Sequence, residues 1–424
     1  MNRFPSYGYG PGLSRRSALA LAGAGLGAVG LGLPATAGAE APAGVSALLN
    51  RAVDEGAVPG LVALIGQGGA AWVHAAGQRL LEASAPMRRD TVFAVASIGK
   101  PLTAVAALML VEDGVLDLDD PVDPWLPELS RRRVLRRLDG ALDETQPAER
   151  PITLRDLLSM RMGLGVVFVD PAATPVLARM QALDLAPGPR LFGGEADAFM
   201  AGIGSLPLID QPGTRWRYHS GLDIAGVLVA RAAGMSLGAF QRERLFGPLG
   251  MVDTGFQAPA DRLAGLYARD AQTGAFQSWN AASGASFSEP PRFEAGGSGH
   301  VSTVDDFHAF GRFLLDGGRA GGQRLLSSEL VAEMLRDQIT PEQKAASPWF
   351  PGDFWDSHGW GLGIALRTDA QARGRFGWWG GFGTAFWCDP ASDRVAALFT
   401  PRLMTSPDDT ALPEAFITAA FDAA

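Results

Sequence analysis

Segments with the pattern of β-strands lie near both ends of this chain, and segments with helical periodicity fill most of the region between them. Near the N-terminus, residues 59–66 and 71–77 are apolar runs separated by Gly68-Gly69, which is the pattern of a β-hairpin. We therefore predict an α+β fold, in which both chain ends build one antiparallel sheet flanked by helices, with an all-helical region inserted. Near the C-terminus, the strand-like runs are 360–367, 375–380, 384–387 and 394–400.

The region between the strands has apolar residues at three- and four-residue spacing, which is the period of amphipathic helices. The stretch 341–359 differs, because it is rich in aromatic residues and lacks a regular period. We predict a long loop there. The predicted helices are 100–113, 153–161, 222–233, 237–245 and 304–315.

Size and charge narrow the possible functions. With 424 residues, 47% of them hydrophobic, the chain can bury one large core or two moderate ones. Its formal net charge is −9, and because nucleic-acid affinity depends on clustered cations, we predict no nucleic-acid partner. We interpret the one basic run, 131–137, as a solvated helical face. The single cysteine, Cys388, excludes an internal disulfide, and we expect it to be a small strand residue.

The first 39 residues have the pattern of a twin-arginine export signal. Arg15 and Arg16 precede a weakly apolar run rich in glycine and alanine at 18–33, and small residues suited to signal peptidase follow at 35–39. This run is too short and too rich in glycine to predict a membrane span. We therefore predict that residues 1–39 are removed and that the mature protein is periplasmic or secreted, without stable membrane insertion; an uncleaved anchor is the alternative.

Lysine is rare in this chain, which draws attention to Lys100. Among 36 Lys and Arg residues only Lys100 and Lys344 are lysines, and an ammonium, unlike a guanidinium, can become a neutral base. Pro101 and the apolar period after it place Ser97 and Lys100 on the first turns of a helix, where residues three apart share a face. The helix dipole favours a neutral lysine and a serine alkoxide there. The pair is therefore a candidate nucleophile with its own base, although a surface lysine in a capped helix is the alternative.

Tyrosine is also rare. Of the four tyrosines, Tyr7 and Tyr9 lie in the predicted signal, which leaves Tyr218 and Tyr267 in the mature protein. Tyr218 follows a turn at 212–216 and precedes a predicted helix. A phenol held beside a lysine can carry a proton between nucleophile and leaving group, although Tyr218 taken alone would more commonly be a core aromatic.

Three short motifs together carry a family resemblance. Residues 97–100 (Ser-Ile-Gly-Lys), 218–220 (Tyr-His-Ser) and 378–381 (Trp-Trp-Gly-Gly) resemble, in order and spacing, the three motifs of the serine β-lactamase-related family. This family includes class C β-lactamases, D-alanyl-D-alanine carboxypeptidases and family VIII-type esterases. Similar segments outside the motifs are 93–97, 116–121, 151–158, 246–251 and 299–303.

The resemblance extends from Val45 to the C-terminus and implies a β-lactamase/transpeptidase-like fold. In such a fold, residues 45–124 and 275–424 would form an α/β sandwich, and residues 125–274 would form a mainly helical region. The active site would lie between the two.

The resemblance also implies roles for the motif residues. Ser97 would be the acylated nucleophile, Lys100 its base or proton partner, and Tyr218 the general base or acid. The backbone amides of Ser97 and Gly381 would form the oxyanion hole, which stabilises a tetrahedral intermediate. The residues implied in substrate binding are His219, Ser220, His300, Trp378, Trp379 and Gly380.

Two positions depart from the pattern of β-lactamases. Ser220 stands where the middle motif usually has asparagine, and Trp378 stands where the third motif usually has a cation. Without this cation, the carboxylate of a penicillin or a D-alanyl peptide has no partner. The departure favours uncharged esters or amides, although the duplicated tryptophan leaves open whether Trp378 or Trp379 takes the cation's position.

We predict no metal and no cofactor, because the histidines lack metal-ligand spacing. Aromatic residues near the predicted loop either close over an acyl chain or cover the core. The histidines are His74, His219, His300, His308 and His358, and the aromatic residues are Trp349, Phe350, Phe354, Trp355 and Trp360.

The sequence therefore predicts an exported serine hydrolase that acts through a covalent acyl-enzyme on a small neutral ester or amide. A β-lactamase or D-alanyl-D-alanine peptidase acting on a cell-wall-derived substrate is one alternative. A penicillin-recognising binding or sensor module that does not turn over is another.

Overall fold

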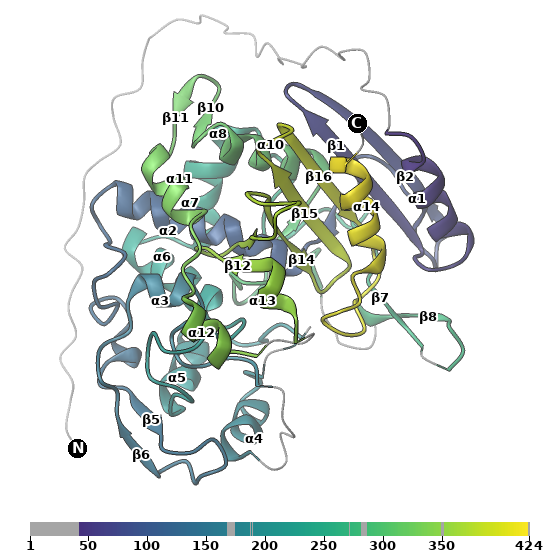
Figure 1. Cartoon of the computed structure of the whole chain (residues 1–424). Coiled ribbons are helices and arrows are strands. Elements are labelled where there is room, and N and C mark those ends of the chain that lie inside the picture. Colours follow the sequence, from purple (N-terminus) through teal and green to yellow (C-terminus); the bar gives the residue numbers. More distant parts are fainter. Residues whose placement is uncertain are drawn as a thin grey trace, which may run out of the picture. The chain divides into compact units, whose positions relative to one another are not determined.

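Strands from the two ends of the chain lie side by side in one antiparallel sheet, which confirms the predicted fold. In the computed structural model, β1 (Gly60–Gln67) pairs with β16 (Arg394–Phe399), where Val62 lies opposite Phe399. The other edge of β1 pairs with β2 (Ala70–Leu80) through the predicted hairpin (Figure 1). Within the described residues the eight-stranded sheet continues from β16 to β15 (Thr384–Asp389), β14 (Phe376–Gly380), β13 (Ala365–Arg367) and β12 (His358–Trp360), and from β2 to β3 (Ala85–Pro86).

The structure describes most of the chain after residue 41, and Gly38–Ala424 is one compact unit. The predicted signal at 1–39 lies outside the described residues. The described residues are 42–167, 174–186, 188, 190–270, 272–280, 286–348 and 352–422. Their helices are α1 (Val45–Asp54), α2 (Lys100–Glu112), α3 (Leu154–Leu158), α4 (Pro175–Ala182), α5 (Ala196–Ser205), α6 (Gly221–Ala233), α7 (Leu237–Gln241), α8 (Gly247–Leu249), α10 (Val304–Leu315), α11 (Ser328–Met334), α12 (Pro341–Ala346), α13 (Phe354–Ser357) and α14 (Ala411–Asp422), with the 3₁₀ turns η1 (Ala96–Gly99) and η2 (Pro127–Leu129) and the π-helical turn η4 (Arg242–Phe246).

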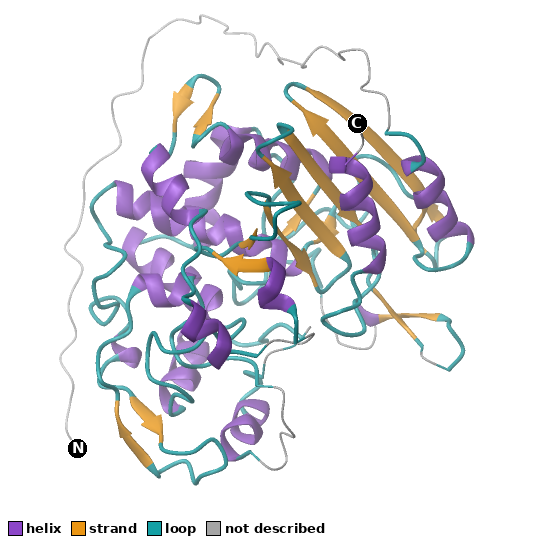
Figure 2. Cartoon of the chain, in the orientation of Figure 1, coloured by secondary structure: helices purple, strands orange, loops and turns teal. Residues whose placement is uncertain are grey.

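Helices cover both faces of the sheet (Figure 2). Successive side chains of a strand point to opposite faces, and β16 shows the consequence. Arg394 donates a hydrogen bond to the carbonyl of Ala420 in α14, whereas Val395 packs against Gly311 in α10. A Cβ on Gly311 would lie 2.8 Å from Val395, so glycine permits this close packing.

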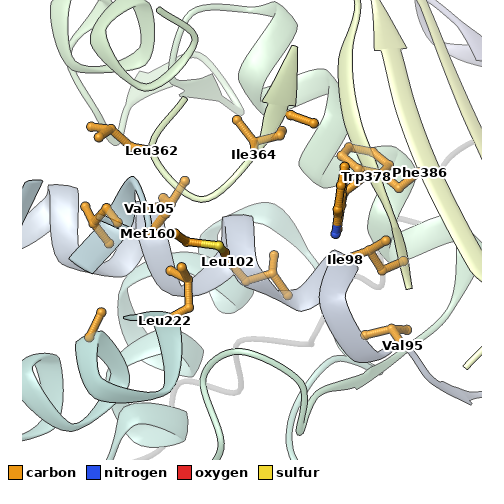
Figure 3. Close-up of a cluster of buried hydrophobic side chains, with 14 of the residues drawn as sticks. Val95, Ile98, Leu102, Val105, Met160, Leu222, Leu362, Ile364, Trp378 and Phe386 are labelled. Atoms are coloured by element: carbon orange, nitrogen blue, oxygen red, sulfur yellow. The ribbon is translucent and has the colours of Figure 1, made fainter. Parts of the chain in front are cut away.

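Helix α2 runs through the interior beside α6, and both are buried along most of their length. Gly221 begins α6 directly against α3, because a Cβ there would lie 2.3 Å from the carbonyl oxygen of Leu157. Figure 3 shows the apolar side chains that join α2 and α6 to the sheet, with Trp378 pointing from β14 toward Ile98.

Among the described residues no single helix is long and apolar enough to cross a membrane. Only the pair α6 and Leu237–Leu249 passes this test together, and the pair is bent by 76°.

Three local predictions were wrong. The strand-like run 360–367 is not one strand, because β12 ends at Trp360 and β13 begins at Ala365, and the two strands pair with each other. The stretch 341–359 is not one long loop, because it contains α12, whose first turn is closed by a capping box between Thr340 and Gln343, and α13. The basic run 131–137 is not a helical face, because its centre is a strand with Val134 buried, and the guanidinium of Arg132 donates to helix-end carbonyls of α5. The short two-stranded sheets, also unpredicted, are β4 (Phe93–Ala94) with β9 (Val301–Ser302), β5 (Arg133–Leu135) with β6 (Thr145–Pro147), β7 (Tyr267–Arg269) with β8 (Phe276–Ser278), and β10 (Arg319–Ala320) with β11 (Gln323–Arg324).

Candidate active site

Ser97 lies on a tight turn between β4 and α2. The amide of Val95 donates to the carbonyl of His300 at 2.9 Å, which anchors the start of this turn. The next residue, Ala96, has a left-handed backbone (φ 49°), a conformation that costs free energy outside glycine and persists where the surroundings enforce it. Residues 96, 98 and 99 are buried, and Ser97 alone in this turn is partly exposed. The turn therefore presents the Ser97 hydroxyl to the cavity described below.

Lys100 is fully buried directly behind Ser97, as the sequence spacing predicts. Its Nζ donates to Ser97 Oγ at 2.9 Å and to the carbonyl of Gly297 at 2.7 Å. Burial lowers the pKa of Lys100 to about 7, although the carboxylate of Asp223 acts in the opposite direction. Near neutral pH a large fraction of this amine is therefore neutral and able to accept the proton of Ser97.

Tyr218 completes the group from the loop before α6. Its hydroxyl is hydrogen-bonded to the side chain of Ser97 and accepts a hydrogen bond at 2.7 Å from Nε1 of Trp378. The Lys100 Nζ lies 4.7 Å from the centre of the Tyr218 ring. Burial raises the pKa of Tyr218 well above its usual value, so the phenol keeps its proton at neutral pH and can donate it.

Ser97 and Tyr218 line a cavity of about 630 Å³, and Lys100 is buried behind Ser97. Its described lining includes the carboxylates of Asp353, Asp408 and Glu414 but no lysine or arginine. Two histidines also line it, and burial lowers the pKa of His219 to about 3 and that of His358 to about 4, so both are neutral at pH 7. Among the described lining residues, a substrate carboxylate therefore meets no cationic side chain. Its lining residues are Ala96, Ser97, Val166, Gly188, Tyr218, His219, Ser298, Asp353, Phe354, Ser357, His358, Trp378, Trp379, Gly381, Phe382, Met404, Thr405, Ser406, Pro407, Asp408, Thr410 and Glu414.

The two tryptophans of the third motif have different neighbours. Trp378 is almost fully buried, and its indole N–H bonds Tyr218. Trp379 is more exposed and packs beside His358 and Trp387. Trp378 is therefore the residue of this pair that contacts the candidate catalytic group.

The predicted substrate-binding residues divide into two sets. His219, Trp378 and Trp379 line the cavity, as does Gly381, which was expected in the oxyanion hole. Ser220, Gly380 and His300 are outside the described lining, and each packs in the interior. The side chain of Ser220 is buried at the start of α6, a Cβ on Gly380 would lie 2.3 Å from the Val95 carbonyl oxygen, and His300 Nε2 lies 3.0 Å from Gln241 Oε1.

The aromatic residues in and near 341–359 also fall into two groups, one that lines the cavity and one that packs in the interior. Phe354 lines the cavity, whereas Trp355 and Trp360 pack around Trp216, with ring centres 5.2 and 5.4 Å away. Trp349 and Phe350 lie outside the described residues. Among the described residues, no group of three or more His, Cys, Asp or Glu side chains could hold a metal ion.

Sequence reasoning missed several residues of the site. Asp223 and Gly297 contact each other behind Lys100, and the segment 404–410 and Glu414 form one wall of the cavity. Asp223 does have a sequence signal, because it is an acidic residue in the first turn of an otherwise apolar helical segment. The segment 404–410 has no such sequence signal, because its polar composition is that of an ordinary surface loop.

A family model described as Beta-lactamase matches residues 45–419. This chain belongs to the beta-lactamase family. It is similar to Protein Rv1367c of Mycobacterium tuberculosis, with 37% identity over 365 residues that cover 83% of this chain and 88% of that protein. It is 33% identical to the lovastatin esterase of Penicillium rubens, over 79% of this chain and 86% of that protein. Among solved structures, EstCE1, a hydrolase with promiscuous acyltransferase activity, superimposes with a TM-score of 0.73 at 25% identity, over 89% of this chain and 97% of that one.

These similarities confirm the predicted family and fold, and with them the coarser part of the functional prediction, a serine hydrolase of this family. The division into a sandwich at 45–124 and 275–424 and a helical region at 125–274 stays a prediction.

Proposed function

We propose that this protein is an esterase that forms a covalent acyl-enzyme on Ser97 and prefers small neutral esters. The observation that carries this proposal is the 2.9 Å contact between Ser97 Oγ and the buried amine of Lys100. Neutral Lys100 takes the proton of Ser97 as Oγ attacks the ester carbonyl. The resulting oxyanion is bound by the backbone amides of Ser97 and Gly381, which both belong to cavity-lining residues.

Tyr218 then supplies the proton that the leaving alkoxide needs. The Tyr218 hydroxyl and the Lys100 Nζ are both hydrogen-bonded to the Ser97 side chain, so the two groups lie close together and the proton taken by Lys100 can replace the one that Tyr218 donates. The net result is transfer of the serine proton to the leaving alcohol. In the second half, water attacks the acyl group, its proton passes back by the same route, and Ser97 is regenerated.

The preference for neutral esters rests on the charges around the cavity. With three carboxylates and no lysine or arginine in the described lining, a substrate carboxylate would lose its hydration without gaining a cation. An unpaired buried charge costs several kcal/mol. The relative named lovastatin esterase supports an ester substrate, and EstCE1, described as a hydrolase with promiscuous acyltransferase activity, supports the acyl-enzyme.

The test compares catalytic efficiencies. We expect kcat/KM for p-nitrophenyl acetate or butyrate to exceed that for benzylpenicillin or a D-alanyl-D-alanine peptide by about a hundredfold or more. Faster cleavage of penicillin or the peptide than of every neutral ester would favour the β-lactamase or peptidase instead. A single burst of nitrophenol without further turnover would favour the sensor module.

We also propose that the protein is exported by the twin-arginine route. The support is the Arg15-Arg16 pair followed by the weakly apolar run at 18–33.

A further inference from the structure

Asp223 is a buried carboxylate that the proposed reaction does not use directly. It lies in the first turn of α6, five residues after Tyr218, and 6% of its surface is exposed. Its Oδ1 accepts a hydrogen bond from the amide of Gly297 at 2.7 Å. Its Oδ2 lies 3.8 Å from Nδ1 of His219, which is neutral. Burying a carboxylate is costly, so its retention in an apolar helix points to a specific task.

Gly297 connects Asp223 to Lys100. The amide of Gly297 donates to Asp223, and its carbonyl accepts from Lys100 Nζ at 2.7 Å. The preceding carbonyl, of Gly296, accepts from Thr103 Oγ1 at 2.7 Å. These three hydrogen bonds hold the loop between α2 and α6, so the position of the Lys100 amine depends on a loop that Asp223 fixes from the other side.

The loop that contains Gly296 and Gly297 packs tightly against α6. A Cβ on Gly297 would lie 2.9 Å from Asp223 Oδ1, and a Cβ on Gly296 would lie 2.7 Å from the carbonyl oxygen of Leu222. Glycine at both positions lets the loop backbone approach α6 closely enough for the carboxylate to reach it. Displacement of this loop would move the acceptor that holds Lys100 against Ser97.

We propose that Asp223 is a positioning residue, which fixes Gly297 and through it holds the Lys100 amine against Ser97 while presenting a negative charge to that amine. This inference rests on the proposed function, in which Lys100 is the base for Ser97. The other titratable groups around Lys100 are Tyr218, His219 and His300, and burial keeps all three neutral at pH 7. Burial raises the pKa of Asp223 itself, whereas the Lys100 ammonium and the Gly297 amide act in the opposite direction. Its ionised form stabilises the ammonium form of Lys100.

Two substitutions separate the hydrogen bond from the charge. Asp223→Asn keeps an oxygen that can accept from Gly297 but removes the charge. We expect the acidic limb of its kcat/KM profile, measured with p-nitrophenyl butyrate, to move to lower pH by about half a unit or more, because the ammonium form loses its stabilising charge. Asp223→Ala also removes the hydrogen bond, and we expect its kcat to fall about tenfold or more at nearly unchanged KM, because Asp223 does not touch substrate.

Thr103→Val is the matched control. It removes a hydrogen bond to the same loop without changing any charge, so its acidic limb should stay in the wild-type position. Thermal unfolding of each variant shows whether it is folded, and if Asp223→Ala does not fold, the pH profile of Asp223→Asn still tests the inference. An unmoved acidic limb in Asp223→Asn, or a wild-type kcat in a folded Asp223→Ala, would overturn it. If the proposed function itself were wrong, Ser97→Ala would still turn over the ester. That result distinguishes failure of the proposed function from failure of the inference about Asp223.

Discussion

Lys100 is the residue on which the proposed chemistry depends, because it must give up a proton inside the protein. Arginine at this position would stay protonated. We expect Lys100→Arg to lower kcat for p-nitrophenyl butyrate about a thousandfold, nearly as much as Ser97→Ala, while circular dichroism shows both variants folded. Near-normal turnover by Lys100→Arg would remove Lys100 from the mechanism.

The pKa of Lys100 also sets the pH dependence of the wild-type enzyme. Below about pH 7 the amine is protonated and cannot accept the serine proton, whereas above it the amine is neutral. We therefore expect kcat/KM to rise as the pH increases through about 7. Burial raises the pKa of Tyr218, so the phenol remains a proton donor on the alkaline side. A kcat/KM that decreases as the pH is raised from about 6 to about 8 would contradict this mechanism.

Trp378 is the residue expected to set substrate choice, because the motif resemblance aligns it with a position where β-lactamases usually have a cation, with Trp379 as the alternative. We expect Trp378→Lys to raise kcat/KM for benzylpenicillin relative to that for p-nitrophenyl butyrate by about tenfold. The matched control is Trp379→Lys, which also places a cation at the cavity but away from Tyr218. An equal or larger gain in the control would mean that Trp379 takes the cation's position.

Residues at the end of β14 and the start of β15 pack against the turn that carries Ser97. Thr384 Oγ1 donates to the carbonyl of Val95 at 2.7 Å, and Gly380 lies against both groups. A Cβ on Gly380 would meet them at 2.2 and 2.3 Å, whereas a Cβ on Gly381 would meet nothing within 4 Å. We expect Gly380→Ala to reduce the free energy of unfolding by about 1–3 kcal/mol and Gly381→Ala to have a much smaller effect. Equal melting temperatures for the two variants would show that this contact does not constrain the turn.

Elements with a strong repeating pattern could be predicted from the sequence, and short or irregular ones could not. The hairpin β1–β2 follows from two apolar runs separated by Gly68-Gly69, and helix α10 follows from a helical period over 12 residues. Helix α12 was missed because its signal is a capping box at Thr340 rather than a period. The run 131–137 was misread because its arginines dominate the composition, while the buried Val134 between them decides the structure.

Across the whole molecule, the site joins segments that are far apart in the chain. Ser97, Lys100 and Tyr218 could be predicted because two of them share a helix face and all three stand in motifs. Gly297 and Glu414 could not, because their neighbours are brought together by packing rather than by local spacing. Asp223 has a sequence signal as an acidic residue in the first turn of α6, but its contact with Gly297 comes from the same packing.

The proposed export concerns the whole chain, which would be a precursor that still carries residues 1–39. We expect replacement of both Arg15 and Arg16 by lysine to leave the precursor in the cytoplasm, because twin-arginine transport reads this pair. Fractionation of cells that express the two forms measures this. Unchanged periplasmic delivery of the lysine variant would show that the signal is of another kind.

The most direct test of the central claim is the mass of the protein during turnover. When the enzyme is mixed with p-nitrophenyl butyrate and quenched rapidly in acid, we expect intact-protein mass spectrometry to show one added butyryl group, which peptide mapping places on Ser97. The same experiment on Ser97→Ala should show neither adduct nor nitrophenol release above background. Sustained ester turnover by Ser97→Ala, or a butyryl group on another residue in the wild-type enzyme, would contradict the account.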